Sequence, residues 1–141
     1  VLMLIPEIAL TEQTVERFKH RFDDRIAVLN YRLSDGEKTD AWRNIAKGNI
    51  PIVIAARSAI FAPIPNLGLV IVDEEHELSY KQIDEMPCYN ARDVAVVRGS
   101  LTNSTVILGS ATPSIESLHN VMTKKYKYLS MTKKAAAKNP P

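Results

Sequence analysis

The chain has 141 residues, 45% of them hydrophobic, which is about the length of one domain and enough apolar material for a core. The net charge is only +2, from 18 Lys and Arg against 16 Asp and Glu, which argues against a general polyanion binder and against an acidic disordered tail. A single cysteine, Cys88, excludes an internal disulfide and a cysteine-rich zinc site, and no apolar run is long enough to span a membrane. We therefore expect a globular domain of the cytoplasm with no membrane partner.

Five short apolar runs are typical of strands buried in a sheet. None alternates strictly between apolar and polar residues, so we predict that both faces of each strand are covered. The runs are Val1–Ile5, Ile26–Asn30, Ile52–Ala55, Leu69–Val72 and Thr105–Leu108. The first run has no initiator methionine and no turn before it, and we expect the chain to be part of a longer protein.

Helical segments separate these runs. N-cap signals predict helices after Thr11, after Ser34 with Glu37 completing a capping box, and after Thr112 with Pro113 as the first helical residue. Alternating strands and helices predict an α/β fold, a mostly parallel sheet with helices on both faces. Ligands bind such sheets at the carboxyl ends of the strands, so the polar residues there are the candidates for function. One face of the last predicted helix carries Ile115, Leu118 and Met122.

Two stretches interrupt the alternation, and one end of the chain is basic. Residues Ala56–Asn66 and Glu77–Asn90 are predicted to be long loops, because prolines and polar residues replace the apolar periodicity. From Ser117 onward the chain holds six lysines and no acid. Residues 124–141 are therefore predicted to be a basic linker.

The first functional motif is Asp73-Glu74-Glu75-His76, which follows the apolar run Leu69–Val72. This is the pattern of a Walker B motif, in which Asp73 lies beside a phosphate-bound Mg²⁺ and Glu74 orients the water that attacks the γ-phosphate. The alternative from the residues alone is a solvated cluster of acids at the end of a strand.

Two other classes of hydrolase are excluded. A zinc protease needs a second histidine four residues after His76, where this chain has Tyr80. A serine hydrolase needs a Gly-x-Ser-x-Gly turn, and none of the five glycines forms one.

The second motif is the segment Gly109–Ser114, which follows the last apolar run. Its small residues let the backbone approach a phosphate or an acid closely. Ser110 and Thr112 can then hydrogen-bond a carboxylate such as Asp73 or Glu74 on an adjacent strand. An ordinary strand-to-helix turn is the alternative.

Two more strand ends carry candidate contacts to a nucleic-acid strand. Free amides between Pro6 and Thr11 can hold a phosphate, and Arg57 and Ser58 offer a charge and a hydroxyl for the same purpose. Helix capping at Thr11 and a structural ion pair at Arg57 are the alternatives.

Together the motifs resemble motifs II and III of superfamily 2 helicases, because Asp-Glu-Glu-His follows one strand and Gly-Ser-Ala-Thr-Pro-Ser follows the next. Longer strings make the sequence similar to the primosomal helicases of bacterial replication restart, over residues 1 to about 130. These strings are Pro-Glu-Ile-Ala-Leu-Thr, Leu-Ser-Asp-Gly-Glu, Arg-Ser-Ala-Ile-Phe-Ala-Pro, Asn-Leu-Gly-Leu-Val-Ile-Val-Asp-Glu-Glu-His, Ser-Tyr-Lys-Gln and Tyr-Asn-Ala-Arg-Asp-Val-Ala.

The resemblance implies an ATP-dependent 3′-to-5′ DNA helicase that acts on forked and single-stranded DNA, with residues 1–123 as part of a RecA-like first motor lobe. It implies ATP and Mg²⁺ as cofactors, with Asp73, Glu74 and His76 as catalytic residues and the metal held by Asp73 through water. Single-strand-binding protein and other primosome proteins are the implied partners. A zinc site is implied elsewhere in the longer protein.

The resemblance also implies a DNA-binding set and a set that couples DNA contact to ATP hydrolysis. The coupling loop is the stretch after Asp-Glu-Glu-His that carries Tyr80, Lys81, Tyr89 and Arg92. Its tyrosine faces can stack on unpaired bases, and Lys81 or Arg92 can meet a phosphate or a motif carboxylate. Packing of the tyrosines against the lobe is the alternative. The chain departs from the usual family pattern at Asn90 and at Tyr31-Arg32. The DNA-binding set is Pro6, Thr11, Arg57, Ser58 and Tyr80, and the coupling set is Ser110, Thr112, Tyr80, Lys81, Tyr89 and Arg92.

The sequence contains no phosphate-cradling Walker A loop. None of its five glycines precedes a lysine, and the resemblance places that loop just before the first strand, so we expect the lobe to be truncated at its N-terminal side. We therefore expect the longer protein to be an ATPase and the isolated chain to be inactive. A non-enzymatic α/β module that binds nucleic acid remains the alternative, and salt-sensitive DNA binding without ATP dependence in the longer protein would favour it.

Overall fold

A five-stranded parallel sheet is the centre of the computed structural model, which describes residues 1–29, 33–84 and 86–132. Its strand order is β2-β3-β1-β4-β7, and β5 pairs with β6 in a separate antiparallel ribbon. The predicted mostly parallel sheet is confirmed, and Asn30, the predicted end of the second strand, lies outside the described residues. The strands are β1 (Leu2–Leu4), β2 (Ile26–Leu29), β3 (Ile52–Ala55), β4 (Leu69–Val72), β5 (Lys81–Gln82), β6 (Tyr89–Asn90) and β7 (Thr105–Leu108).

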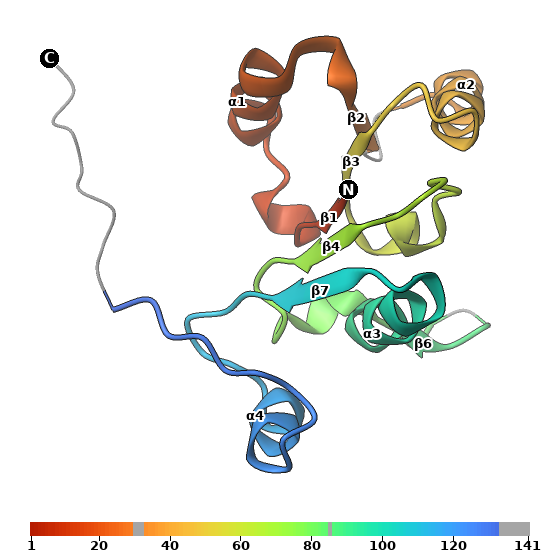
Figure 1. The fold of residues 1–141 in the computed structure, drawn as a ribbon. Helices are drawn as coiled ribbons and strands as arrows, with labels where there is room; N and C mark the ends of the chain where they lie inside the picture. Colours follow the sequence, from red (N-terminus) through yellow and green to blue (C-terminus); the bar gives the residue numbers. More distant parts are fainter. Residues whose placement is uncertain (30–32, 85, 133–141) are drawn as a thin grey trace, which may run out of the picture.

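Helices cover the sheet from two sides: α1 lies on one side and α2 and α3 on the other (Figure 1). This division follows from right-handed crossovers, because the connection from β1 to β2 crosses the sheet in one direction and the later connections run the opposite way. The α-helices are α1 (Glu12–Phe22), α2 (Asp35–Ala46), α3 (Ala91–Thr102) and α4 (Ile115–Met122), and the 3-10 helices are η1 (Glu7–Ala9), η2 (Asp23–Arg25), η3 (Arg57–Phe61) and η4 (Leu78–Tyr80).

Side-chain caps fix where these helices begin. The Thr11 hydroxyl accepts a hydrogen bond from Thr14 N at 3.3 Å, and Ser34 forms the predicted capping box with Glu37. The predicted start of the last helix at Pro113 is wrong. Its N-cap is Ser114, whose hydroxyl accepts a hydrogen bond from Ser117 N.

The main core lies between the sheet and the helices α2 and α3. Alternate residues of β1 and β4 point into it, so both strands present fully buried side chains to this side. Residues of α2, η3 and α3 complete the cluster. Its fully buried members include Leu2, Leu4, Ile45, Val53, Ile60, Val70, Val72 and Ala95.

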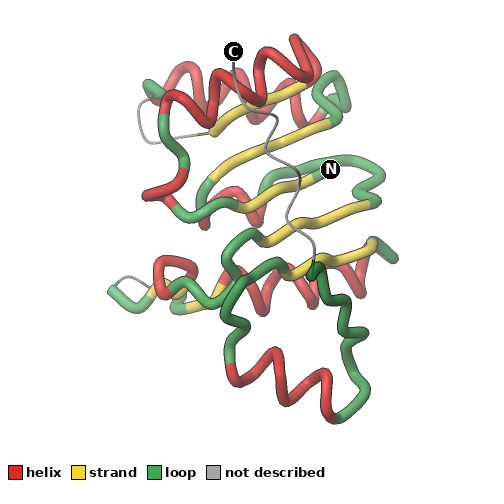
Figure 2. Tube along the Cα trace, turned by 90° about the vertical axis from the view of Figure 1, so that its left-hand side faces the viewer, coloured by secondary structure: helices red, strands yellow, loops and turns green. Residues whose placement is uncertain are grey.

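The prediction that both faces of every strand are covered is wrong at β7. Ile107 of this edge strand is 48% exposed, beside Ile71 in the register of the sheet. The reason is that α1, the helix on this face, packs against β2 at the opposite edge. Helix α4 lies beyond β7 and away from the other helices, and its Ile115 and Met122 are exposed (Figures 1 and 2).

The two predicted loops contain only short elements. Residues 56–66 hold η3, and residues 77–90 hold η4 and the β5–β6 ribbon. After a turn at the end of α4, residues up to 132 form neither helix nor strand, and the remainder of the predicted linker lies outside the described residues. No helix in the described ranges is long and apolar enough to cross a membrane.

Candidate active site

The parallel sheet brings the predicted functional segments to one edge. Pro6, Arg57, Asp73 and Ser110 each lie one or two residues beyond the carboxyl end of β1, β3, β4 or β7. Since β1, β4 and β7 are neighbours in the sheet, the Asp-Glu-Glu-His turn lies between the other two segments. The backbone continues the sheet for one more residue, because Asp73 N donates to Leu4 O at 2.9 Å.

The two acids of the predicted Walker B pattern form a tight turn. Asp73 Oδ1 accepts a hydrogen bond from Glu74 N at 3.1 Å, which leaves the other carboxylate oxygen of Asp73 for a ligand. Glu74 has a φ of 46°, in the left-handed region that non-glycine residues rarely adopt. Both side chains are half-buried, as a carboxylate that meets solvent and a ligand requires.

His76 joins this turn to the segment Gly109–Ser114. Its Nδ1 lies 2.7 Å from Ser110 Oγ, and its Nε2 lies 3.4 Å from Thr112 Oγ1. The prediction that these hydroxyls bond Asp73 or Glu74 is therefore wrong, because the histidine lies nearer to them and provides two ring nitrogens. His76 Nδ1 is also 3.6 Å from Glu74 Oε2, so the imidazole contacts both motifs.

The backbones of the two motifs also touch. Glu75 N donates to Gly109 O at 2.9 Å, and Gly109 N donates to Val72 O at the same distance. A Cβ on Gly109 would lie 3.8 Å from Asp73 Oδ1, so the close approach of backbone to acid that the small residues predict is present.

Glu75 is a buried acid that sequence reasoning missed. Its side chain is 1% exposed, and its carboxylate accepts hydrogen bonds from Ser114 N at 2.6 Å and from the Ser117 hydroxyl at 3.0 Å. Arg92 lies 3.3 Å away and supplies the opposite charge. Burial alone would raise the pKa of Glu75, but the hydrogen bonds from Ser114 and Ser117 and the charge of Arg92 together lower it. Glu75 is therefore an ionised, fully paired carboxylate that connects the turn to α4.

Arg92 contacts a motif carboxylate, one of the two options that the sequence left open. Besides Glu75, its guanidinium donates to Asp93 at 2.9 Å and to the Ser114 hydroxyl at 2.8 Å. With only 7% of the residue exposed, Arg92 cannot also serve as a surface contact for a phosphate. Asn90, one of the departures from the family pattern, caps α3 by accepting a hydrogen bond from Arg92 N; Tyr31-Arg32, the other, lies outside the described residues.

The predicted tyrosine contacts with bases do not fit the structure at Tyr80. This residue is 1% exposed and belongs to the main core, so packing against the lobe is the correct alternative. Its hydroxyl donates to Asp73 O at 2.6 Å, which places it in contact with the turn that carries the acids. Burial and then the charge of Asp73 raise the pKa of Tyr80, so its hydroxyl stays protonated.

The other two members of the loop differ in exposure. Tyr89 is half-buried and makes an edge-to-face contact with Phe61, with ring centroids 5.1 Å apart. Lys81 is exposed, and its backbone oxygen accepts a hydrogen bond from Arg57.

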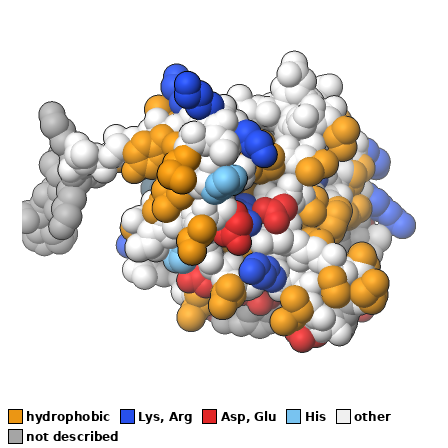
Figure 3. Space-filling model, turned by 90° about the horizontal axis from the view of Figure 1, so that it is seen from below, with side chains coloured by type: hydrophobic (Ala, Val, Ile, Leu, Met, Phe, Trp, Pro, Cys, Tyr) orange, Lys and Arg blue, Asp and Glu red, His pale blue; other side chains and the backbone are white. Residues whose placement is uncertain are grey.

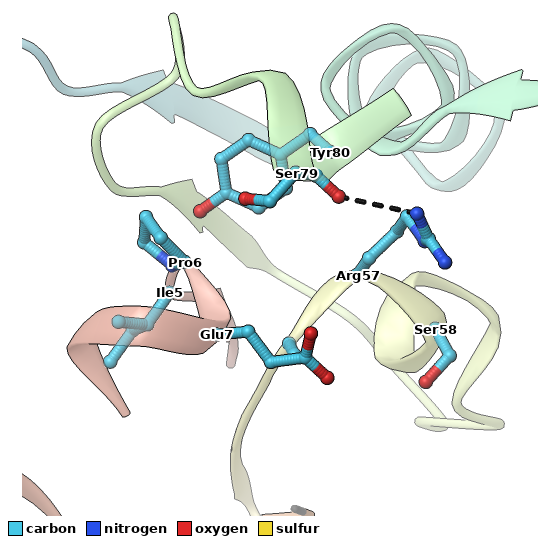
Figure 4. Close-up of a pocket in the computed structure, with 8 residues that line it drawn as sticks. Ile5, Pro6, Glu7, Arg57, Ser58, Ser79 and Tyr80 are labelled. Carbon is cyan, nitrogen blue, oxygen red and sulfur yellow. Dashed lines mark hydrogen bonds between the residues drawn. The ribbon is translucent and has the colours of Figure 1, made fainter. Parts of the chain in front are cut away.

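Four of the five residues predicted to bind DNA line one pocket of about 70 Å³. This volume is well below the roughly 300–1,000 Å³ of pockets that enclose a small-molecule ligand. Figure 4 shows the Arg57 side chain reaching toward Ser79, with Glu7 on another wall of the same pocket. Thr11 is not part of the lining and instead caps α1. The residues of the predicted DNA-binding set in the pocket are Pro6, Arg57, Ser58 and Tyr80.

Side chains of both charges gather on one face of the molecule. Seen from below, this face shows acidic side chains beside a histidine, with lysine or arginine close by and hydrophobic side chains around them (Figure 3). Among the described residues no group of three or more His, Cys, Asp or Glu side chains could hold a metal ion. A metal at Asp73 would therefore need other ligands besides protein side chains.

A parallel sheet with Asp-Glu-Glu-His after one strand and a contacting Ser-Ala-Thr segment after the next is the arrangement of a helicase motor domain. The sequence matches the DEAD/DEAH box helicase family over residues 1–121, and the chain belongs to this family. The predicted resemblance to helicases and the RecA-like α/β fold are thereby confirmed.

The chain is also similar to individual proteins named replication restart protein PriA. It is 55% identical to the protein of that name from Chlamydia trachomatis over 99% of the chain, and 51% identical to that from Bacillus subtilis over 92%. The match to the Haemophilus influenzae protein is 49% identical over 96% of the chain. The chain spans 19%, 16% and 18% of these three relatives, so it corresponds to less than a fifth of the length of each.

Proposed function

We propose that the chain is part of an ATP-dependent 3′-to-5′ DNA helicase of bacterial replication restart, acting on forked and single-stranded DNA in the cytoplasm. The contact of His76 with Ser110 and Thr112 carries the proposal, because it connects the two motifs beside the acids Asp73 and Glu74. The identity to the PriA relatives supports the class of substrate. Single-strand-binding protein and primosome proteins are the partners we propose, with zinc bound elsewhere in the longer protein.

Asp73 and Glu74 have separate roles in this proposal. Asp73 fits a magnesium ion that keeps its water ligands, because Mg²⁺ usually binds proteins through one or two carboxylates plus substrate phosphates. When ATP is bound, that ion neutralises charge on the phosphate groups. Glu74 orients the attacking water and takes its proton. His76 Nδ1 lies 3.6 Å from Glu74 Oε2, so the imidazole lies beside this carboxylate.

Coupling to DNA depends on the contacts around these acids. Ser110 and Thr112 communicate with the turn through His76, and Arg92 acts through Glu75. Tyr80 acts through the backbone of Asp73, while Lys81 and Tyr89 belong to the ribbon that follows it. Pro6, Thr11, Arg57 and Ser58 provide the side of the domain on which the DNA strand lies.

ATP turnover by the longer protein tests the proposal. We expect phosphate release that single-stranded DNA stimulates and strand separation that needs ATP. Salt-sensitive binding of DNA with no effect of ATP and no turnover would contradict the proposal and support a non-enzymatic binding module.

The isolated chain provides a second test. Because none of its glycines precedes a lysine, it has no Walker A loop to cradle phosphates, and we expect no ATP binding in a calorimetric titration and no turnover. Tight ATP binding by the 141-residue chain would show that the phosphate contacts lie in the residues described above, which would contradict this part of the proposal.

A further inference from the structure

The Arg57 guanidinium is hydrogen-bonded to backbone carbonyls of the chain itself. It donates to Lys81 O at 2.9 Å and to Ser79 O at 3.4 Å, so it fixes both ends of the short segment that contains Tyr80. Both hydrogen bonds come from Nη1, whose N–H groups point in fixed directions in the plane of the guanidinium. The side chain is half-buried and lines the pocket, so a ligand in the pocket can reach the same donors (Figure 4).

The segment that Arg57 holds is connected directly to the acids. The Tyr80 hydroxyl donates to the backbone oxygen of Asp73 at 2.6 Å, and the next residue in the chain is Glu74. The tyrosine ring is buried in the core, so a movement of the segment cannot leave this hydrogen bond unchanged. A continuous path of two contacts therefore runs from the pocket to the Asp73–Glu74 turn.

We propose that Arg57 is a positioning residue that restrains the Asp73–Glu74 turn through Tyr80, and that a phosphate of a bound DNA strand releases this restraint by taking the guanidinium from the two carbonyls. This inference rests on the proposed function. It assigns to Arg57 a role beyond DNA contact, because the same donors hold the loop before DNA arrives.

The chemistry favours the exchange. A guanidinium and an ionised phosphate form parallel charge-assisted hydrogen bonds between opposite charges, whereas the two carbonyls are neutral acceptors, so a phosphate competes well with carbonyl oxygens. A ligand shifts a conformational equilibrium only by its difference in affinity for the two states, and the freed guanidinium provides that difference. The Glu7 carboxylate lines the same pocket and repels a free anion. Only a phosphate held by the rest of a DNA strand is therefore expected to displace the carbonyls.

Two substitutions separate the restraint from simple DNA binding, measured as ATP turnover with and without saturating single-stranded DNA. Arg57→Lys keeps a positive charge for the phosphate but lacks the rigid planar group that aims the Nη1 donors at the two carbonyls. Tyr80→Phe removes only the hydroxyl that bonds Asp73 O. In the longer protein we expect each to raise the DNA-free rate and to lower the stimulation by DNA by about five- to tenfold, the value of one hydrogen bond.

A double variant and a control complete the test. Because both residues lie on one path, Arg57→Lys with Tyr80→Phe should be no more activated than either single variant. Arg43→Gln removes an arginine that is exposed on α2 and does not line the pocket, and should leave both rates unchanged. Lower DNA-free rates in the two single variants, or normal stimulation by DNA, would overturn the restraint.

Hydrogen exchange tests the same step without turnover. Single-stranded DNA should increase amide exchange at residues 79–82 of the longer protein, and inorganic phosphate should not. The increase should be present without DNA in Arg57→Lys, which no longer holds the two carbonyls as the guanidinium does. Unchanged or slower exchange on DNA binding would overturn the inference even if the ATPase is confirmed. A protein with no ATPase would contradict the proposed function, and the exchange measurement would still test the restraint.

Discussion

The carboxylate of Glu75 accepts a hydrogen bond from the backbone N–H of Ser114 at 2.6 Å, although the two residues lie 39 positions apart in the sequence. The contact joins the turn after β4 to the N-terminus of α4. Ser117 and Arg92 complete the pairing of the carboxylate. No buried side-chain nitrogen or oxygen among the described residues lacks a partner. Glu75 and Arg92, which also donates to the Ser114 hydroxyl, therefore hold the N-terminus of α4 beside the site.

Glu75→Ala is expected to destabilise the chain by about 3 kcal/mol, because it leaves Arg92 with less compensation in a buried position. The measurement is urea denaturation of the 141-residue chain. Glu116→Ala is the matched control, since Glu116 also lies near Arg92, at 3.7 Å, but is exposed, and its removal should have a much smaller effect. Equal losses for the two variants would show that burial of the Glu75–Arg92 pair does not matter.

Low pH should remove the same contribution. Because folding lowers the pKa of Glu75 below its ordinary value of 4.5, its stabilising effect is present above that value and is lost as the pH falls through the folded-state pKa. The difference in unfolding free energy between the natural chain and Glu75→Gln should therefore shrink as the pH falls below 4.5. A difference that is constant between pH values of about 6 and 3 would contradict an ionised Glu75.

Glu74→Gln tests the proposed general base. Glutamine keeps the shape of the side chain but cannot accept a proton, so the longer protein should still bind ATP while its turnover falls by about 10²–10⁴-fold. The readout is DNA-stimulated phosphate release together with ATP affinity. Undiminished turnover would remove Glu74 from this role.

Ser110→Ala combined with Thr112→Ala should separate ATP hydrolysis from strand separation. The two hydroxyls contact His76 and neither acid, so their loss frees the imidazole but leaves Asp73 and Glu74 unchanged. We expect much of the ATPase to remain while unwinding by the longer protein is lost. Ser100→Ala, at an exposed serine of α3, is the control. If both activities fall equally, these hydroxyls support folding or chemistry and not coupling.

Two glycines should respond to alanine in opposite ways. A Cβ on Gly99 would collide with Val106 Cγ2 and approach Ser104 O to 3.3 Å, so Gly99→Ala should destabilise the chain by about 1–3 kcal/mol. A Cβ on Gly36, in helix α2, meets nothing within 4 Å, and Gly36→Ala should stabilise it by about 0.5–1 kcal/mol. Thermal unfolding of both variants measures the difference. An unchanged or higher Tm for Gly99→Ala would contradict the packing at Gly99, and a lower Tm for Gly36→Ala would contradict the open space at Gly36.

Local patterns were sufficient for the sheet and for two of the helix starts. The runs Ile52–Ala55, Leu69–Val72 and Thr105–Leu108 became strands with the predicted bounds, because each is a short apolar segment with polar residues at its end. Thr11 and Ser34 cap helices by contacts within three residues, which a sequence displays directly. The strand ends then place the predicted acids and hydroxyls at one edge of the sheet.

Contacts across long stretches of sequence explain what the patterns missed. Thr112 and Ser114 are both residue types that favour the N-cap position, so the sequence alone does not choose between them. In the structure Ser114 is the N-cap of α4, and its backbone N–H donates to the Glu75 carboxylate. From the sequence, Tyr80 fits a base-stacking residue and a core residue equally well. Only the folded structure shows that it is buried. The sequence signal for a partner of Glu75 was the three-residue spacing of Ser114 and Ser117. At a helix N-terminus this spacing brings the two hydroxyls together, so that both can donate to one acceptor.

Glu74 keeps a left-handed backbone, with a φ of 46°, at a cost of about 1–2 kcal/mol for a residue that is not glycine. Glycine would adopt this conformation without that cost, but it would delete the carboxylate on which the proposed chemistry depends. A laboratory selection of the chain for heat resistance alone is therefore expected to enrich glycine or asparagine at position 74. The most heat-resistant variants would then be the ones that have lost ATP hydrolysis. At position 74, stability and activity therefore favour different residues.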